Sequence, residues 1–148
     1  MRLLTRRLLS GAGAGLIATI PMSAVMFAAQ RLSTVDELDP EIITETGLEA
    51  AAVGGGETTE NLVSSVAHLG FGAAVGALYG LVKPLVSAPP LLTGPLYGLV
   101  VAGANYQGWL PAMGILPPLS RRAPARISTV LLSHVVYGAV LGPLANRR

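Results

Sequence analysis

Cysteine is absent from this 148-residue chain, and acidic residues are absent from most of it. The lack of cysteine excludes disulfides, thiolate metal sites and cysteine nucleophiles. All 8 Asp and Glu residues lie between positions 36 and 60. The rest of the chain therefore lacks the carboxylates that hydrolases and proton-coupled pumps use for acid–base chemistry.

Charge of either sign is missing from four long stretches: residues 8–30, 61–82, 84–120 and 127–146. A helix needs roughly 20 apolar residues to cross about 30 Å of hydrocarbon, so each stretch is long enough. The chain is 51% hydrophobic and 12% charged, whereas soluble domains average about 25% charged residues. The sequence thus predicts an integral membrane protein with spans near residues 8–30, 61–82, 94–116 and 127–146.

The predicted fold is all-α, an integral membrane four-helix bundle that forms one domain over residues 1–148. Residues 31–60 are expected to be a solvated polar loop, in which Asp39-Pro40 marks the start of a helix, with Asp39 as its cap. The first span has an alternative interpretation as a signal peptide, because three arginines precede it. Its apolar run exceeds the usual length of about 7–15 residues, which favours a retained span.

An internal repeat relates the second span to the fourth. The pattern His-x-x-aromatic-Gly-Ala-x-x-Gly-x-Leu begins at His68 and again at His134. A weaker echo links Gly11-x-x-x-Gly15 in the first span to Gly94-x-x-x-Gly98 in the third. Two tandem helical hairpins running in the same direction would explain both matches. Chance similarity between glycine- and alanine-rich segments is the alternative.

Small residues in the spans indicate close helix packing. Helices in lipid associate through close backbone approach, which glycine permits. The glycines at four-residue spacing in the second and fourth spans are Gly72, Gly76, Gly80, Gly138 and Gly142. Packing within the chain accounts for them, and homo-oligomerisation through a remaining small-residue face is the alternative.

The polar residues inside the spans are the candidates for a functional interior. They are His68, Asn105, Tyr106, Gln107 and His134. An ionisable residue at such depth is a functional hypothesis by default. The histidines could simply hydrogen-bond to neighbouring helices, line a polar path for protons or a small solute, or ligate a metal or haem. Two histidines make an incomplete zinc site, since zinc usually takes at least three protein ligands.

The sequence therefore predicts no catalytic residue, no metal site, no cofactor and no enzymatic activity. Basic residues occur in ones to threes at the ends of apolar segments, which is typical of membrane-flanking charge rather than of nucleic-acid binding. The expected partners are the lipid bilayer and a second copy of the chain. The leading function is a small structural or interaction component of the membrane. The rival is a small channel or transporter with a path lined by His68, Asn105, Gln107 and His134.

The third span contains the most distinctive run of the chain. Residues 108–114 read Gly-Trp-Leu-Pro-Ala-Met-Gly, and Pro117-Pro118, an arginine cluster and His134-x-x-Tyr-Gly follow. This arrangement resembles the YagU-like family of small, largely uncharacterised prokaryotic integral membrane proteins. The resemblance implies a multi-span membrane fold and supplies no reaction or ligand.

Lysine and arginine counts set the expected orientation in the cell membrane. The ends that would lie with both termini hold Arg2, Arg6, Arg7, Lys83, Arg147 and Arg148, and the opposite ends hold Arg31, Arg121, Arg122 and Arg126. The excess predicts that both termini are cytoplasmic and that the acidic loop lies on the other side. The cluster at residues 121–126 argues for the reverse orientation.

Overall fold

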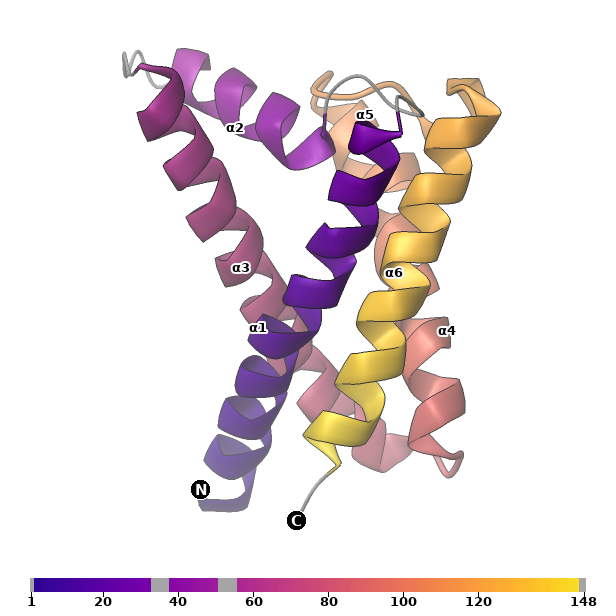
Figure 1. The fold of residues 1–148 in the computed structure, drawn as a ribbon. Helices are drawn as coiled ribbons and strands as arrows, with labels where there is room; N and C mark the ends of the chain where they lie inside the picture. Colours follow the sequence, from indigo (N-terminus) through magenta and orange to yellow (C-terminus); the bar gives the residue numbers. More distant parts are fainter. Residues whose placement is uncertain (1, 33–37, 51–55, 147–148) are drawn as a thin grey trace.

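The computed structural model describes residues 2–32, 38–50 and 56–146 and confirms the all-α prediction (Figure 1). The helices are α1 (Arg2–Arg31), α2 (Asp39–Ala50), α3 (Glu57–Val82), α4 (Pro90–Gly103), α5 (Leu110–Ala112) and α6 (Pro124–Ala145). A π-helical turn, Ala104–Trp109, joins α4 to α5, and short 3-10 helices occupy Lys83–Leu85 and Leu119–Arg121. The parts of the predicted polar loop at 33–37 and 51–55 lie outside the described residues.

Three helices in the described part of the chain are long and apolar enough to cross a membrane. These candidate spans cover Arg2–Arg31, Thr58–Leu85 and Pro124–Ala145. They correspond to the first, second and fourth predicted spans. The third predicted span, residues 94–116, does not form one continuous α-helix, because that segment is divided among α4, the π-helical turn and α5.

The break in the third segment has two local causes. Pro111 lacks the N–H that would bond to the carbonyl of residue 107, so a regular α-helix cannot continue through it. Gly108 adopts non-helical angles, φ −108° and ψ −109°. Shortly afterwards Gly114, at φ 73°, ends α5. Its N–H bonds to the Pro111 carbonyl at 3.1 Å, and the N–H of Ile115 bonds to the Leu110 carbonyl at 3.1 Å, the paired bonds of a Schellman cap.

Glycines bring α1 and α3 into backbone contact. A Cβ added at Gly11, Gly15 or Gly76 would overlap backbone atoms of the facing helix. One added at Gly72 would overlap the side chain of Thr19, and one added at Gly80 would overlap the carbonyl oxygen of residue 7. The contact therefore depends on the absence of side chains at these positions.

Helices α4 and α6 also approach each other through glycines. A Cβ on Gly94 would meet the Gly138 carbonyl, as a Cβ on Gly15 would meet the carbonyl of Gly72. Gly94 thus takes the structural place of Gly15, whereas the sequence echo aligned it with Gly11. The predicted alignment is wrong by one turn, because glycines at four-residue spacing match equally well after a shift of four.

The two helix pairs meet where α1 packs against α6. Buried Tyr137 of α6 donates a hydrogen bond to the Gly72 carbonyl of α3 at 2.7 Å. Tyr97 of α4 donates to the Val75 carbonyl of α3 at 2.8 Å, and its ring lies 5.1 Å from that of Tyr79. Apolar side chains such as Leu141, which is fully buried, fill the remaining space.

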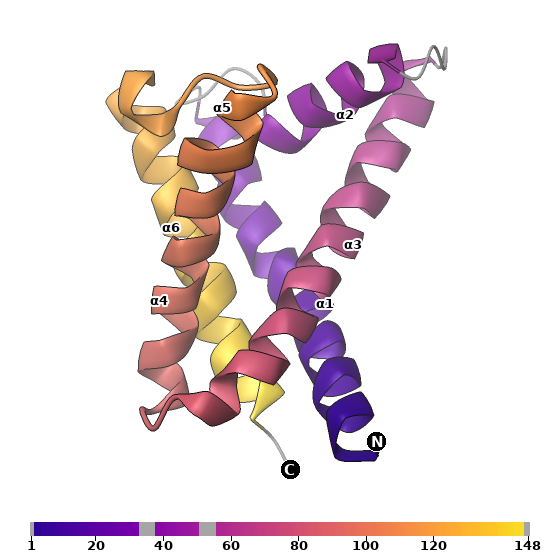
Figure 2. The same ribbon diagram turned by 180° about the vertical axis from the view of Figure 1, so that it is seen from behind.

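The two ends of the bundle differ in shape. Both termini lie at one end, and α2 and α5 lie at the other (Figure 1). From their crossing, α1 and α3 diverge toward the α2 end, and α2 runs across the space between them (Figure 2). In contrast, α4 and α6 stay side by side along their length. We call the two regions the terminal end and the α2 end.

Candidate functional site

A cavity of about 200 Å³ lies at the α2 end, where α1, α2, α3 and α6 face the π-helical turn. We call it the histidine cavity, because both repeat histidines line it. Its polar lining residues are Thr44, Ser64, His68, Asn105, Tyr106 and His134. Its remaining lining residues are Met22, Met26, Pro40, Ile43, Ala67, Phe71, Trp109 and Leu110. The structure therefore brings four of the five predicted interior residues to one cavity.

His134 is buried, and one ring nitrogen is already bonded within its own helix. Its Nδ1 lies 2.8 Å from the carbonyl oxygen of Val130, four residues earlier. A carbonyl only accepts hydrogen bonds, so we assign the proton to Nδ1. In the neutral ring Nε2 then carries a lone pair and acts as an acceptor. No residue in the described part of the chain bonds to this Nε2.

His68 contributes the second imidazole to the cavity. Its Nε2 is buried and has no hydrogen-bond partner among the described residues. Buried polar atoms are rarely left unpaired, since the lost hydrogen bond costs roughly 1–3 kcal/mol. The simplest expectation was a hydrogen bond from each histidine to a neighbouring helix. His134 instead bonds to a carbonyl of its own helix, and Nε2 of His68 has no partner among the described residues.

The π-helical turn sets the orientation of the remaining polar residues. Asn105 is buried, and its Oδ1 accepts a hydrogen bond of 2.9 Å from Trp109 Nε1. The Tyr106 ring is buried and meets the His134 ring edge-on, with centroids 5.8 Å apart. Gln107 is exposed and does not line the cavity. Its placement in the predicted interior is wrong, because the residue after two inward-facing positions points away from them.

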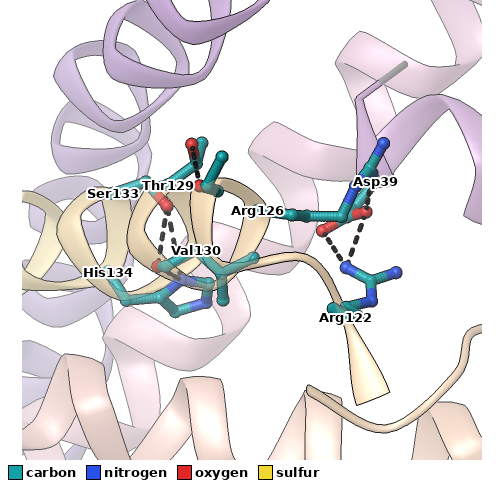
Figure 3. A network of polar contacts seen from close by, with 8 residues as sticks. Asp39, Arg122, Arg126, Thr129, Val130, Ser133 and His134 are labelled. Carbon is teal, nitrogen blue, oxygen red and sulfur yellow. Dashed lines mark hydrogen bonds and ion pairs between the residues drawn. The ribbon is translucent and has the colours of Figure 1, made fainter. Parts of the chain in front are cut away.

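A buried ion-pair cluster holds the α2 end together (Figure 3). Arg122 Nη1 contacts both carboxylate oxygens of Asp39, at 2.9 and 3.0 Å, and Arg126 Nη1 lies 2.8 Å from Oδ1. The side chains of Asp39 and Arg122 are 3% and 4% exposed. Arg122 also lies over the Tyr106 ring, 5.4 Å from its centroid. The cluster ties the start of α2 to α6, and α2 supplies Pro40, Ile43 and Thr44 to the cavity wall.

The prediction of Asp39 as a solvated helix cap is wrong in both respects. Asp39 is buried, and its carboxylate is used by the two arginines. The start of α2 is capped instead by Glu41, whose Oε2 accepts a hydrogen bond of 3.1 Å from the N–H of Leu38. A helix does form here as predicted, and it begins at Asp39 itself, one residue before the expected first helical position.

A second, larger hollow adjoins the histidine cavity. It has a volume of about 510 Å³ and runs between the diverging parts of α1 and α3 below α2. It shares Met26, Pro40, Ser64 and His68 with the histidine cavity. We call it the side groove. Its other lining residues are Ile20, Ser23, Phe27, Leu38, Glu41, Asn61, Ser65 and Leu69.

The five glycines predicted to serve helix packing each face a helix of the same chain, so packing within the chain accounts for all of them. Among the described residues, no group of three or more His, Asp or Glu side chains is placed to hold a metal ion. The ion pair of Asp39 was not foreseen, because its partners lie 83 and 87 residues away in sequence.

Fold and site together define an all-α helix bundle with three helices of membrane-spanning length and a polar-lined cavity at one end. The chain belongs to a family of unknown function, DUF6789, whose model matches residues 5–148. It matches no curated protein and no solved structure.

Proposed function

We propose that this chain is a non-enzymatic, multi-pass membrane protein that binds a small molecule in the histidine cavity. The main supporting observation is that polar side chains from different helices line one cavity. His68 comes from α3, His134 from α6 and Asn105 from the π-helical turn. Side chains that served only helix packing would each be satisfied by one neighbouring helix. The unpartnered Nε2 of His68 supports a ligand-binding role instead.

A channel function, in which a solute passes through the whole bundle, has less support. Toward the terminal end, α1 and α3 meet through Gly11, Gly15 and Gly76 with no room for added side chains. Tyr79 and Leu141 are buried on the same side of the cavity. The rival function as a channel would require this packed region to open. The cavity thus favours a binding protein over a pore, and over a purely structural component.

Membrane location is supported by the outer surface. Large apolar side chains such as Leu16, Ile20 and Leu132 are exposed on the candidate spans, at 45%, 60% and 55%. Soluble proteins rarely expose continuous apolar surface on this scale. We propose four crossings, with the broken segment from α4 to α5 as the third. Irregular backbone at membrane depth is tolerated where protein surrounds it, and Asn105 and Tyr106 are buried.

The orientation follows from the lysine and arginine counts. We propose a cell-membrane location with both termini cytoplasmic and α2 on the opposite side. Since the chain has no cysteine, single cysteines introduced at the exposed residues Glu49 and Leu3, both outside the proposed spans, would report their sides without background labelling. Labelling of Glu49→Cys from outside intact cells, and of Leu3→Cys only after permeabilisation, would support this orientation. The reverse pattern would contradict it.

Ligand binding is tested by blocking the cavity. Ser64 is buried and lines both hollows, so Ser64→Phe should place a ring at their shared wall and obstruct both, whereas Ser128→Phe adds the same ring at an exposed position outside them. Each protein would be purified in mild detergent, and the small molecules it retains would be measured by mass spectrometry. We expect a retained molecule in the unaltered protein and in Ser128→Phe, and its loss in Ser64→Phe. Equal content in all three folded proteins would contradict the proposal.

A further inference from the structure

We propose that the ligand of the histidine cavity is a neutral membrane lipid with a hydroxyl head group. This inference rests on the proposed function and names the chemical class of its ligand. The hydroxyl would lie between His134 and Asn105, and the apolar chain would leave through the side groove. Three features carry the proposal: the charge of the cavity, its hydrogen-bonding atoms and its size.

The lining of the cavity selects against charge. None of its described lining residues is Asp, Glu, Lys or Arg. The charged cluster of Asp39, Arg122 and Arg126 lies outside this lining, and Nη1 of each arginine is paired with Asp39. An ionised head group would lose its hydration on entry and find no charged side chain on the described lining to pair with, which is costly in a low-dielectric site. A neutral ligand avoids that cost.

The available polar atoms require both a donor and an acceptor from the ligand. Because His134 Nδ1 donates to the Val130 carbonyl, Nε2 of the neutral ring can only accept. Asn105 uses its Oδ1 to accept from Trp109, which leaves its amide N–H groups as donors. One hydroxyl meets both requirements, because it donates to the imidazole and accepts from the amide. His68 Nε2, now unpartnered, is a further available atom on the same cavity.

The size of the two hollows indicates where the rest of the ligand lies. At about 200 Å³, the histidine cavity is smaller than typical small-molecule pockets of roughly 300–1,000 Å³. It has room for a head group but not for a long chain. The side groove adds a hollow of about 510 Å³ that shares four lining residues and carries Ile20, Phe27 and Leu69. An alkyl or isoprenoid chain fits that lining.

The only tryptophan of the chain, Trp109, lines the cavity and reports on its contents. Bromine quenches tryptophan fluorescence at short range. Three probes of equal chain length would be titrated into the protein in detergent: an alcohol brominated next to its hydroxyl, the matched alkyl bromide, and the matched bromo-carboxylate at a pH where it is ionised. We expect saturable quenching by the alcohol with an affinity about tenfold above that of the alkyl bromide, the value of one hydrogen bond, and none by the carboxylate.

A variant and its control locate the hydroxyl. His134→Phe keeps a ring beside Tyr106 but removes the acceptor, so the affinity for the alcohol should fall about tenfold, to that of the alkyl bromide. Gln107→Leu changes an exposed amide outside the cavity and should leave the affinity unchanged. If His134→Phe does not fold, the three-probe comparison on the unaltered protein still decides the question.

The outcomes separate this inference from the proposed function. Saturable quenching in which the alkyl bromide equals the alcohol, or the carboxylate exceeds it, would overturn the hydroxyl-lipid inference while leaving a ligand-binding cavity. No saturable quenching by any probe would overturn the inference, and unchanged retained content in Ser64→Phe would overturn the proposed function. Displacement of the bromo-alcohol by unbrominated isoprenoid alcohol, diacylglycerol or quinol would show which natural source of the hydroxyl binds.

Discussion

The terminal end and the α2 end of this bundle are built on opposite principles. At the terminal end, helices touch through backbone at Gly11, Gly76 and their neighbours, and added side chains have no space. At the α2 end, α1 and α3 separate, and the space holds two hollows, a buried ion-pair cluster and the repeat histidines. The packed end fixes the geometry, which allows the other end to keep an open, polar-lined volume.

The two helix pairs also differ in how closely their helices pack beside the cavity. Gly98 in α4 brings that helix against the His134 carbonyl, so α4 and α6 remain close beside the cavity. The equivalent position in α1 is Thr19, a larger residue whose Oγ1 bonds back to the Gly15 carbonyl at 2.9 Å. Toward the α2 end, α1 and α3 diverge (Figure 2). One repeat thus forms a closed pair and the other an open one.

The largest expected effect comes from breaking the ion-pair cluster at the α2 end. Among the described residues, Asp39 supplies the one carboxylate bonded to Arg122, so Asp39→Asn leaves that buried guanidinium without this counter-charge. We expect a loss of about 3–5 kcal/mol in the free energy of unfolding, the usual cost of removing one partner of a buried pair. Denaturant titration in detergent, followed by circular dichroism, measures it.

Two further variants control this prediction. Glu49→Gln removes an exposed carboxylate from the same helix and should change the stability by less than about 0.5 kcal/mol. Asp39→Leu combined with Arg122→Met removes both charges and should recover much of the loss. A stability of Asp39→Asn equal to that of the unaltered protein would show that the cluster is not buried in the folded state.

The next effect concerns the packed terminal end. A Cβ at Gly76 would lie 2.7 Å from the Cα of Gly15, so Gly76→Ala should push α1 and α3 apart. We expect a destabilisation of about 1–3 kcal/mol, as for overpacked cores. Gly13→Ala adds the same methyl group where nothing lies within 4 Å and serves as the control. Equal thermal midpoints for the two variants would remove the contrast between the two ends.

The smallest effect concerns the tyrosines that join the helix pairs. Tyr137→Phe removes a buried hydrogen bond of 2.7 Å to the Gly72 carbonyl. A loss of about 1 kcal/mol is expected. Tyr97→Phe removes a bond of 2.8 Å at a half-buried site and should cost less. If Tyr97→Phe proved the more damaging in denaturant titrations, the two helix pairs would not be joined mainly at Tyr137.

Much of the fold could be predicted because it depends on local sequence. Charge-free length predicts α1, α3 and α6, and the Asp39-Pro40 pair marks the start of α2. The glycine spacing predicts close packing, but a four-residue repeat matches itself after a shift of four, so it could not fix the register. The π-helical turn was missed because proline and glycine indicate a break without specifying its shape.

The candidate site was predicted less completely. The repeat singled out His68 and His134, and both line the same cavity. Gln107 could not be separated from Asn105 by composition alone, since its orientation depends on the π-helical turn. The buried ion pairs of Asp39 could not be predicted, because acidic residues in a polar loop usually face water and its arginine partners lie far along the chain.

The most direct test of the account is whether His68 and His134 face one cavity. In the naturally cysteine-free chain, His68→Cys with His134→Cys would be treated in native membranes with a short, lipid-permeable bifunctional thiol reagent. The matched pair His68→Cys with Gln107→Cys places the second thiol on the exposed face. We expect an intramolecular cross-link in the first pair and none in the second. Cross-linking of only the second pair, or of neither, would contradict a shared histidine cavity.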